Sequence, residues 1–123
     1  MNLSFDNSKP IYLQLMEYFF QQICNGSIKP GQKLPSVRET AVLAGVNPNT
    51  VQRTYAEMER RGIVEARRGQ GSFVTEDELV IKELRSEISE QYVTTFIAYM
   101  QGNGFTKEEI LEQVKATLNK SNG

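Results

Sequence analysis

Polar side chains that suit nucleic-acid bases stand close together at residues 47–53, Asn-Pro-Asn-Thr-Val-Gln-Arg. Asn and Gln can form paired hydrogen bonds with adenine, Arg pairs with guanine, and Thr can contact a thymine methyl group or a phosphate. Asn is also a favourable N-cap and Pro a favourable first residue of a helix, so the segment is expected to open one. These side chains could read base edges if they share an exposed helix face.

A second candidate is the sequence Arg-Arg-Gly-Gln-Gly-Ser-Phe-Val at residues 67–74. Its two glycines allow a tight turn and a close backbone approach to a phosphate, and its arginines add positive charge. The phosphate could belong to a nucleotide held by the loop, or to a nucleic-acid backbone met by the tip of a hairpin. A nucleotide-binding loop follows a strand and opens a helix, whereas this one joins two short extended runs, residues 63–66 and 72–75. The hairpin is therefore the favoured interpretation, with Phe73 anchoring its second strand in the core.

The helix that carries the first candidate is predicted over residues 47–61. Its apolar side chains recur at a spacing of four and then three residues: Val51, Tyr55 and Met58. At about 100° per residue the opposite face collects another set: Asn49, Gln52, Arg53, Ala56 and Arg60. That set could be only the solvated side of the helix. For the charged residues Glu57, Arg60 and Arg61 the two interpretations are equally good, whereas for the Asn, Gln and Arg of the first two turns contact with bases is favoured.

The elements around this helix complete a recognisable unit. An apolar stripe with a four-residue repeat predicts a first helix over residues 10–25, through Ile11, Leu15, Phe19 and Ile23. The spacing Ser36-x-x-Glu39 is a capping box, which predicts a short helix that ends at Gly45. Two helices joined by a Gly turn and followed by a hairpin indicate a winged helix-turn-helix over residues 1–75.

The last part of the chain, residues 76–123, is predicted to form two helices. An apolar stripe runs from Ile81 to Met100, a Gly-Asn-Gly sequence interrupts it, and the capping box Thr106-x-x-Glu109 opens a last helix. Two helices cannot readily enclose a small-molecule pocket of about 300 Å³ or more, so their apolar faces need another partner. The stripe could pack back on the winged helix of its own chain, but a second copy of the chain is favoured, since a twofold pair also matches a palindromic DNA site.

The fold class that we expect is therefore mainly α with a small β-hairpin: a winged helix-turn-helix followed by a two-helix C-terminal dimerisation hairpin. Eight apolar residues of the tail are expected at the dimer interface: Leu84, Ile88, Tyr92, Phe96, Tyr99, Ile110, Val114 and Leu118.

The composition narrows the classes of function. The chain has no histidine and a single cysteine, Cys24, which removes the commonest general base and nearly all ligands of a transition-metal site. We therefore predict neither an enzyme nor a metal or other cofactor, and we interpret Cys24 as a packing residue rather than a redox sensor. Because the sequence shows no run of about 18 apolar residues and no secretory leader, we expect a cytoplasmic protein without membrane contact.

Charge divides the chain unevenly. Residues 1–75 contain nine Lys and Arg against six Asp and Glu, whereas residues 76–123 contain five against nine. A basic front part and an acidic back part indicate two separate tasks. The front part is the candidate for binding a polyanion such as DNA.

The combined motifs resemble the N-terminal winged helix of the GntR family of bacterial transcription regulators. The resemblance covers most of residues 9–75. It rests on Tyr-Leu-Gln-Leu from residue 12, Ile-Lys-Pro-Gly-Gln-Lys-Leu-Pro-Ser-Val-Arg-Glu from residue 28, Gly-Val-Asn-Pro-Asn-Thr-Val-Gln-Arg-Thr-Tyr-Ala-Glu-Met-Glu from residue 45, Gly-Ile-Val from residue 62 and Arg-Gly-Gln-Gly-Ser-Phe-Val from residue 68. Many members carry Arg where this chain has Gln52, and Ser or Thr followed by Arg where it has Asn47-Pro48. The sequence here is similar instead to the YtrA-like branch, so the DNA sites of other branches are not expected to transfer.

The residues and the resemblance together predict a set of DNA contacts: Ser36, Arg38, Asn47, Asn49, Thr50, Gln52, Arg53, Arg68, Gly69, Gln70 and Gly71. Arg38 could instead pair with an acidic neighbour, and Asn47 is expected to serve both as a cap and as a phosphate neighbour. We expect a sequence-specific transcription regulator that binds a palindromic operator as a homodimer and represses. The alternative is a winged-helix adaptor that binds a protein and has no sequence preference for DNA. No small-molecule effector is assigned.

Overall fold

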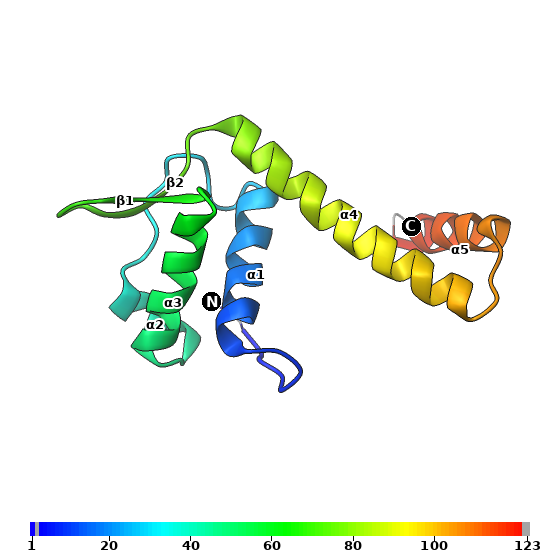
Figure 1. The fold of residues 1–123 in the computed structure, drawn as a ribbon, viewed down its shortest axis with the longest axis horizontal. Helices are drawn as coiled ribbons and strands as arrows, with labels where there is room; N and C mark the ends of the chain where they lie inside the picture. Colours follow the sequence, from blue (N-terminus) through cyan, green and yellow to red (C-terminus); the bar gives the residue numbers. More distant parts are fainter. Residues whose placement is uncertain (2, 122–123) are drawn as a thin grey trace. The chain divides into compact units, whose positions relative to one another are not determined.

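The computed structural model describes residue 1 and residues 3–121, and it confirms the predicted fold class of a winged helix-turn-helix with C-terminal helices (Figure 1). Its elements are α1 (Ile11–Cys24), α2 (Val37–Ala44), α3 (Pro48–Arg60), β1 (Val64–Arg67), β2 (Gly71–Val74), α4 (Glu78–Gly102) and α5 (Lys107–Ser121). The chain divides into two compact units, Met1–Arg85 and Ser86–Gly123, so α4 begins in the first unit and ends in the second.

Both helices of the helix-turn-helix begin at the predicted caps. The Ser36 hydroxyl accepts a hydrogen bond from the Glu39 amide at 3.1 Å, and the Glu39 carboxylate accepts one from the Ser36 amide at 3.1 Å. The backbone hydrogen bond from Ser36 lowers the pKa of the Glu39 carboxyl below its usual range. At the next helix the side chain of Asn47 accepts from the Asn49 amide at 2.8 Å. Local side-chain chemistry thus satisfies amide groups that the helix starts leave without partners.

The core of the first unit lies between α1 and α3, which run beside each other in Figure 1. The predicted stripe of α3 is buried, namely Val51, Tyr55 and Met58. The stripe of α1 is buried at Leu15, Phe19 and Ile23, whereas Ile11 at its start is exposed. The Phe19 and Tyr55 rings meet edge to face with their centroids 5.7 Å apart. Aromatic pairs favour this geometry, so the contact fixes how α3 lies on α1.

A buried hydrogen-bond network joins α2 to α3. The Tyr55 hydroxyl donates to the Pro35 carbonyl at 2.7 Å and shares a second hydrogen bond of 2.7 Å with the Thr40 hydroxyl. Burial raises the pKa of Tyr55, so the phenol stays neutral. A buried polar group is stabilising only when its hydrogen bonds are made, and here each partner is present. The network therefore holds the two helices at one angle.

A third segment, which was predicted only to form a turn, pairs with the hairpin. β1 and β2 pair antiparallel, with Val64 opposite Val74. The segment of residues 31–34 lies along the other edge of β2, where the Leu34 amide donates to the Ser72 carbonyl at 2.8 Å. Pro-Gly correctly indicated a turn before this segment, but pairing with a strand about 40 residues away leaves no local trace in the sequence.

α4 begins three residues earlier than the predicted stripe, because Asp77 caps it by accepting from the Leu79 amide at 2.9 Å. In its first part Leu84 is buried, and the Arg85 guanidinium donates to the Cys24 carbonyl.

Burial raises the pKa of the Cys24 thiol, which disfavours the reactive thiolate. Among the described residues no helix is long and apolar enough to cross a lipid bilayer.

Candidate nucleic-acid interface

The polar face predicted for α3 is exposed in the structure. Five residues form it: Asn49, Gln52, Arg53, Ala56 and Arg60. The helix is rigidly supported beneath this face, since Val51 and Met58 are fully buried and Thr54 donates to the Tyr12 carbonyl at 3.1 Å. A recognition helix needs both properties, because its side chains must reach a groove from a fixed backbone.

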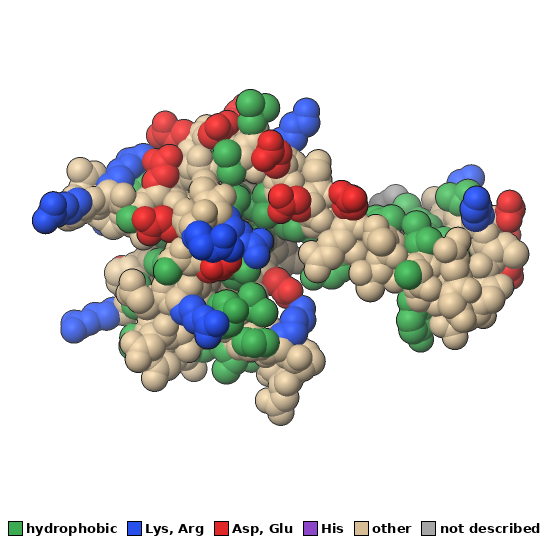
Figure 2. Space-filling model, viewed as in Figure 1, with side chains coloured by type: hydrophobic (Ala, Val, Ile, Leu, Met, Phe, Trp, Pro, Cys, Tyr) green, Lys and Arg blue, Asp and Glu red, His purple; other side chains and the backbone are tan. Residues whose placement is uncertain are grey.

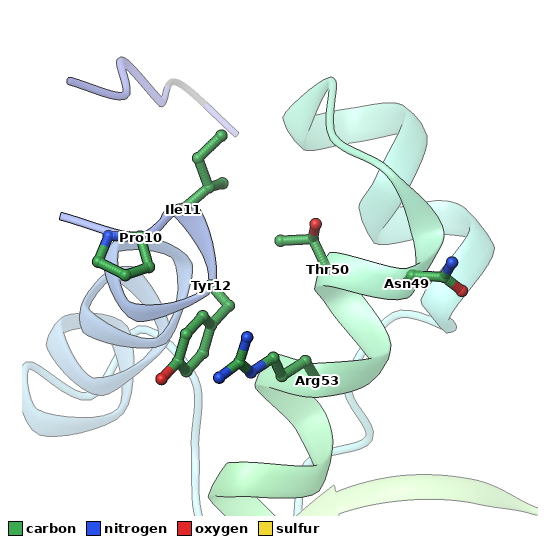
Figure 3. Close-up of a pocket in the computed structure, with 6 residues that line it drawn as sticks. All are labelled: Pro10, Ile11, Tyr12, Asn49, Thr50 and Arg53. Carbon is green, nitrogen blue, oxygen red and sulfur yellow. The ribbon is translucent and has the colours of Figure 1, made fainter. Parts of the chain in front are cut away.

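The side chains of Gln52 and Asn49 form no hydrogen bond or ion pair with the part of the chain that the structure describes, whereas Arg53 contacts an aromatic ring. Its guanidinium carbon lies 3.8 Å from the centroid of the Tyr12 ring, which belongs to α1. Figure 3 shows the Arg53 side chain directed toward α1, while Asn49 points away from that helix. The two residues border an open pocket of about 390 Å³ that is also lined by Pro10, Ile11 and Thr50. Tyr12 was not expected at the interface, and its separation of 41 positions from Arg53 gives the sequence no signal of the contact.

The charged residues at the end of α3 pair among themselves. Glu57 receives a 2.5 Å contact from Arg60 and one of 3.4 Å from Arg61. The hydrogen bond from Arg60 lowers the pKa of the Glu57 carboxyl to about 2. Exposed ion pairs of this kind stabilise little. The pairs are compatible with the solvated interpretation of these three residues, and the alternative of a contact with DNA stays a prediction.

Two contact residues were expected at the start of α2: Ser36, which is its N-cap, and Arg38 in its first turn. The Ser36 hydroxyl oxygen accepts the capping hydrogen bond described above, which leaves its O–H able to donate to a phosphate. Arg38 is exposed and forms no ion pair or hydrogen bond with any residue of the described chain. It borders a second open pocket together with Glu39 and the exposed side chains of Val42 and Leu43. The alternative in which Arg38 pairs with an acidic neighbour is therefore not seen in the described chain.

The tip of the hairpin carries the Gly-x-Gly sequence in left-handed backbone. Gly69 has φ +75° and Gly71 has φ +117°. Arg68 and Gln70 are exposed there, whereas the Arg67 guanidinium stacks 4.1 Å from the centre of the Phe73 ring. In Figure 2 basic side chains project from this tip, while acidic ones gather around the start of α4. Arg67 also lies 3.9 Å from Glu65 and 4.0 Å from Glu76, so the exposed Arg68 is the arginine of the tip that suits a phosphate backbone.

Lys33 is a further basic residue at the wing that the sequence analysis missed. A Cβ placed on Gly71 would lie only 2.9 Å from the Lys33 Cε atom, so the lysine stem covers this glycine. The pairing of residues 31–34 with β2 brings it there. The sequence shows only a basic residue two positions after Pro-Gly. Its place beside the wing follows from the pairing of Lys33 with Phe73, which the sequence does not indicate.

We expect Gly71→Ala to lower the free energy of unfolding by about 1–3 kcal/mol, since an L-residue at φ +117° is strained; the added Cβ meets only the flexible end of the Lys33 side chain, which can move aside. Gly69→Ala is the matched control. Its φ of +75° is close to the ordinary left-handed region and its Cβ would meet nothing within 4 Å, so a smaller loss of about 1 kcal/mol is expected. Urea denaturation of both variants measures the difference, and equal losses would contradict this account of the wing.

In the second unit, most residues expected at the dimer interface are exposed. Tyr92, Phe96 and Tyr99 of α4 are 55%, 39% and 71% exposed, and Val114 and Leu118 of α5 are also exposed. Ile88 is half-buried, whereas Ile110 is buried. Leu84 is buried as well, in the first unit, because α4 begins in that unit.

The exposed apolar surface of the second unit is larger than predicted. Three exposed side chains were not on the expected stripe: Val93, Phe105 and Leu111. Figure 2 shows hydrophobic side chains open to solvent on this unit. Contiguous apolar surface on a small helical unit usually marks an interaction site. The described residues contain no group of three or more His, Cys, Asp or Glu side chains that could hold a metal ion.

Comparison with known families agrees with this geometry. The family described as "Bacterial regulatory proteins, gntR family" matches residues 11–74. The HTH-type transcriptional regulator YhcF of Bacillus subtilis is 49% identical over 115 residues, which cover 94% of this chain and 95% of that protein. The HTH-type transcriptional repressor YtrA of the same organism is 46% identical over 71 residues, 58% of this chain and 55% of YtrA.

Solved structures show the same arrangement. A GntR family transcriptional regulator from Listeria monocytogenes superposes with a TM-score of 0.88 at 44% identity, covering 91% of this chain and 98% of that one. The DNA-binding domain of AraR, solved in complex with operator ORX1, superposes with a TM-score of 0.57 at 26% identity and covers 61% of this chain and 96% of its own. Similarity to YhcF and to the Listeria protein therefore extends into the C-terminal helices, whereas the AraR domain covers a smaller part of the chain.

Proposed function

The chain belongs to the GntR family of bacterial transcription regulators and has the family's DNA-binding domain, and from this premise we propose that it is a homodimeric repressor that binds a palindromic operator. The observation that carries the proposal is the exposed face of α3, where Asn49 and Gln52 are free while the residues beneath them are buried. Asn and Gln at the start of a recognition helix are suited to adenine in the major groove. Since the target is chromosomal DNA, we expect the protein to act in the cytoplasm.

Phosphate contacts would orient this helix. We assign them to Arg38 on α2 and to the wing, where Arg68 and Gln70 flank glycines in left-handed backbone. Lys33 adds a cation beside Gly71. Backbone contacts of this kind supply much of the affinity and make it fall steeply with salt. The AraR domain bound to its operator supports this use of the fold.

The second unit supplies the proposed dimer contact. Its exposed apolar residues on α4 and α5 need a partner, and a second copy provides the same surface with twofold symmetry. A symmetric dimer would place two recognition helices about one DNA turn apart, roughly 34 Å, on a palindromic site. A dimer bound across a promoter would exclude RNA polymerase. The similarity to the repressor YtrA favours repression over activation.

A mobility-shift assay tests the proposal. The probe is a duplex from the DNA immediately upstream of the encoding gene, and a scrambled duplex of equal length and composition is the reference. Wild-type protein is expected to prefer the upstream duplex by about 10³-fold or more. Gln52→Ala should weaken binding to the upstream duplex by about ten- to a hundredfold and leave the scrambled duplex unaffected, because the lost contact is to a base.

Gln21→Ala is the matched control, since it makes the same chemical change at an exposed position near the end of α1. It is expected to bind both duplexes like wild type. If Gln52→Ala also bound both like wild type, base recognition by Gln52 would be disproved. If the wild-type protein bound the two duplexes equally, sequence-specific regulation would be disproved.

The alternative function is a protein-binding adaptor. The observation that favours it is the exposed pair Val42 and Leu43 on α2, which are 81% and 54% exposed beside Arg38. An adaptor would show no preference between the two duplexes in the assay above. The free polar face of α3 makes the regulator the better supported function.

A further inference from the structure

The contact between Arg53 and Tyr12 divides the polar face of α3 into two parts. Successive residues of a helix are about 100° apart, so Gln52 and Arg53 cannot point in the same direction. The Arg53 guanidinium lies over the Tyr12 ring at 3.8 Å and therefore on the side of α3 that faces α1 (Figure 3). Gln52 remains exposed on the other side of the polar face. The two side chains are thus aimed at different parts of any DNA bound to α3.

Tyr12 is well fixed to act as a platform. It lies in the first turn of α1 and is half-buried, and its carbonyl accepts the hydrogen bond from Thr54 in the middle of α3. That hydrogen bond crosses from one helix to the other, so the backbone that carries the Tyr12 ring is fixed relative to α3. A guanidinium stacked on an aromatic face is restrained in position while its edge keeps N–H donors that can bind phosphate.

The surroundings of Arg53 leave its charge uncompensated. None of the six residues that line the pocket is acidic, and Arg53 makes no ion pair or hydrogen bond with any other residue in the described part of the chain. The pocket is open rather than enclosed, which suits a group presented from outside. A fixed cation on a rigid platform beside an open pocket is an arrangement for binding an anion at the surface.

We propose that Tyr12 is a positioning residue that holds Arg53 for a phosphate of the DNA backbone, so that Arg53 strengthens binding to every sequence and does not read a base. The inference rests on the proposed DNA-binding function. From its place beside Gln52, Arg53 was expected to contact a base; the structure favours a phosphate instead. Specific recognition is left to the free side of α3, where Asn49 and Gln52 lie. The YtrA-like sequence Gln-Arg thus combines a base-reading residue with a phosphate-binding one.

Fluorescence anisotropy on the full chain with the upstream and scrambled duplexes tests the role of Arg53. Arg53→Ala should weaken both by the same factor, about tenfold or more, because a phosphate is present in each. The slope of log K against log salt should fall by about 2, one contact for each subunit of the dimer. Because the position is exposed, this variant is expected to fold. A loss confined to the upstream duplex, or an unchanged salt slope, would overturn the phosphate role.

A double-mutant cycle tests the role of Tyr12. Tyr12→Leu removes the ring and should weaken both duplexes by several-fold, whereas Tyr12→Phe keeps the ring face and should bind like wild type. In the Arg53→Ala background Tyr12→Leu should have no further effect. Tyr18→Leu, the same change elsewhere on α1, is the control and should leave DNA binding unchanged.

Two outcomes would overturn the positioning role: Tyr12→Leu weakening DNA binding equally with and without Arg53, or Tyr12→Phe binding as poorly as Tyr12→Leu. Thermal melting of Tyr12→Leu shows whether the variant is folded, and Tyr12→Met, which also removes the ring, replaces it in the cycle if it is not. The proposed function fails separately, when the wild-type protein shows no preference for the upstream duplex. The equal effect of Arg53 on both duplexes can still be measured in that case.

Discussion

Phe96→Glu is expected to convert the proposed dimer into a monomer and to weaken binding to the upstream duplex by about a hundredfold or more. Phe96 lies on the exposed stripe of α4 between Tyr92 and Tyr99, all of which would be covered by the partner. A charge buried without a partner at an interface is strongly unfavourable. Once the subunits separate, each binds a half-site alone, and the advantage of two linked contacts, about 10²–10⁴-fold, is lost.

Analytical ultracentrifugation measures the change in mass, and anisotropy measures the change in affinity. Thr94→Glu is the matched control, because it adds the same charge to an exposed position on the opposite side of α4. It should remain dimeric and bind like wild type. A Phe96→Glu protein that stayed dimeric would exclude this stripe as the interface, and one that became monomeric but bound with unchanged affinity would exclude cooperative binding by two subunits.

The second large effect is expected in the core. Phe19→Ala should lower the free energy of unfolding by about 3–5 kcal/mol, a large part of the 5–15 kcal/mol typical of a domain. Phe19 is 1% exposed and its ring meets the rings of Tyr18 and Tyr55 edge to face. Its loss would leave a cavity between α1 and α3, the two helices that orient the DNA-binding face. Binding should weaken in step with the unfolded fraction.

Ile11→Ala on the same helix provides the comparison. Ile11 is 43% exposed, so its truncation should change the free energy of unfolding by no more than about 0.5 kcal/mol. Chemical denaturation followed by circular dichroism measures both variants. A Phe19→Ala protein as stable as Ile11→Ala would show that the contact between α1 and α3 is not the centre of the core.

The local parts of this structure could be predicted because their causes are local. The capping box at Ser36 and the N-cap at Asn47 act over two or three residues, and the structure has both. The apolar spacing around Tyr55 follows from helix geometry, so the buried and exposed faces of α3 could be assigned. The Gly-x-Gly at residues 69–71 was correctly interpreted as a hairpin tip, since the runs on either side were too short for a phosphate-binding helix.

What the sequence by itself determined is therefore the order of elements, their caps, their faces and the family. Contacts between distant residues were decided only by the tertiary structure. The stacking of Arg53 on Tyr12, the position of Lys33 over the wing and the burial of Leu84 all depend on how elements pack. The physical reason is that periodicity and capping act along one segment. A side chain's partner across the core is set by packing, which no spacing along the chain records.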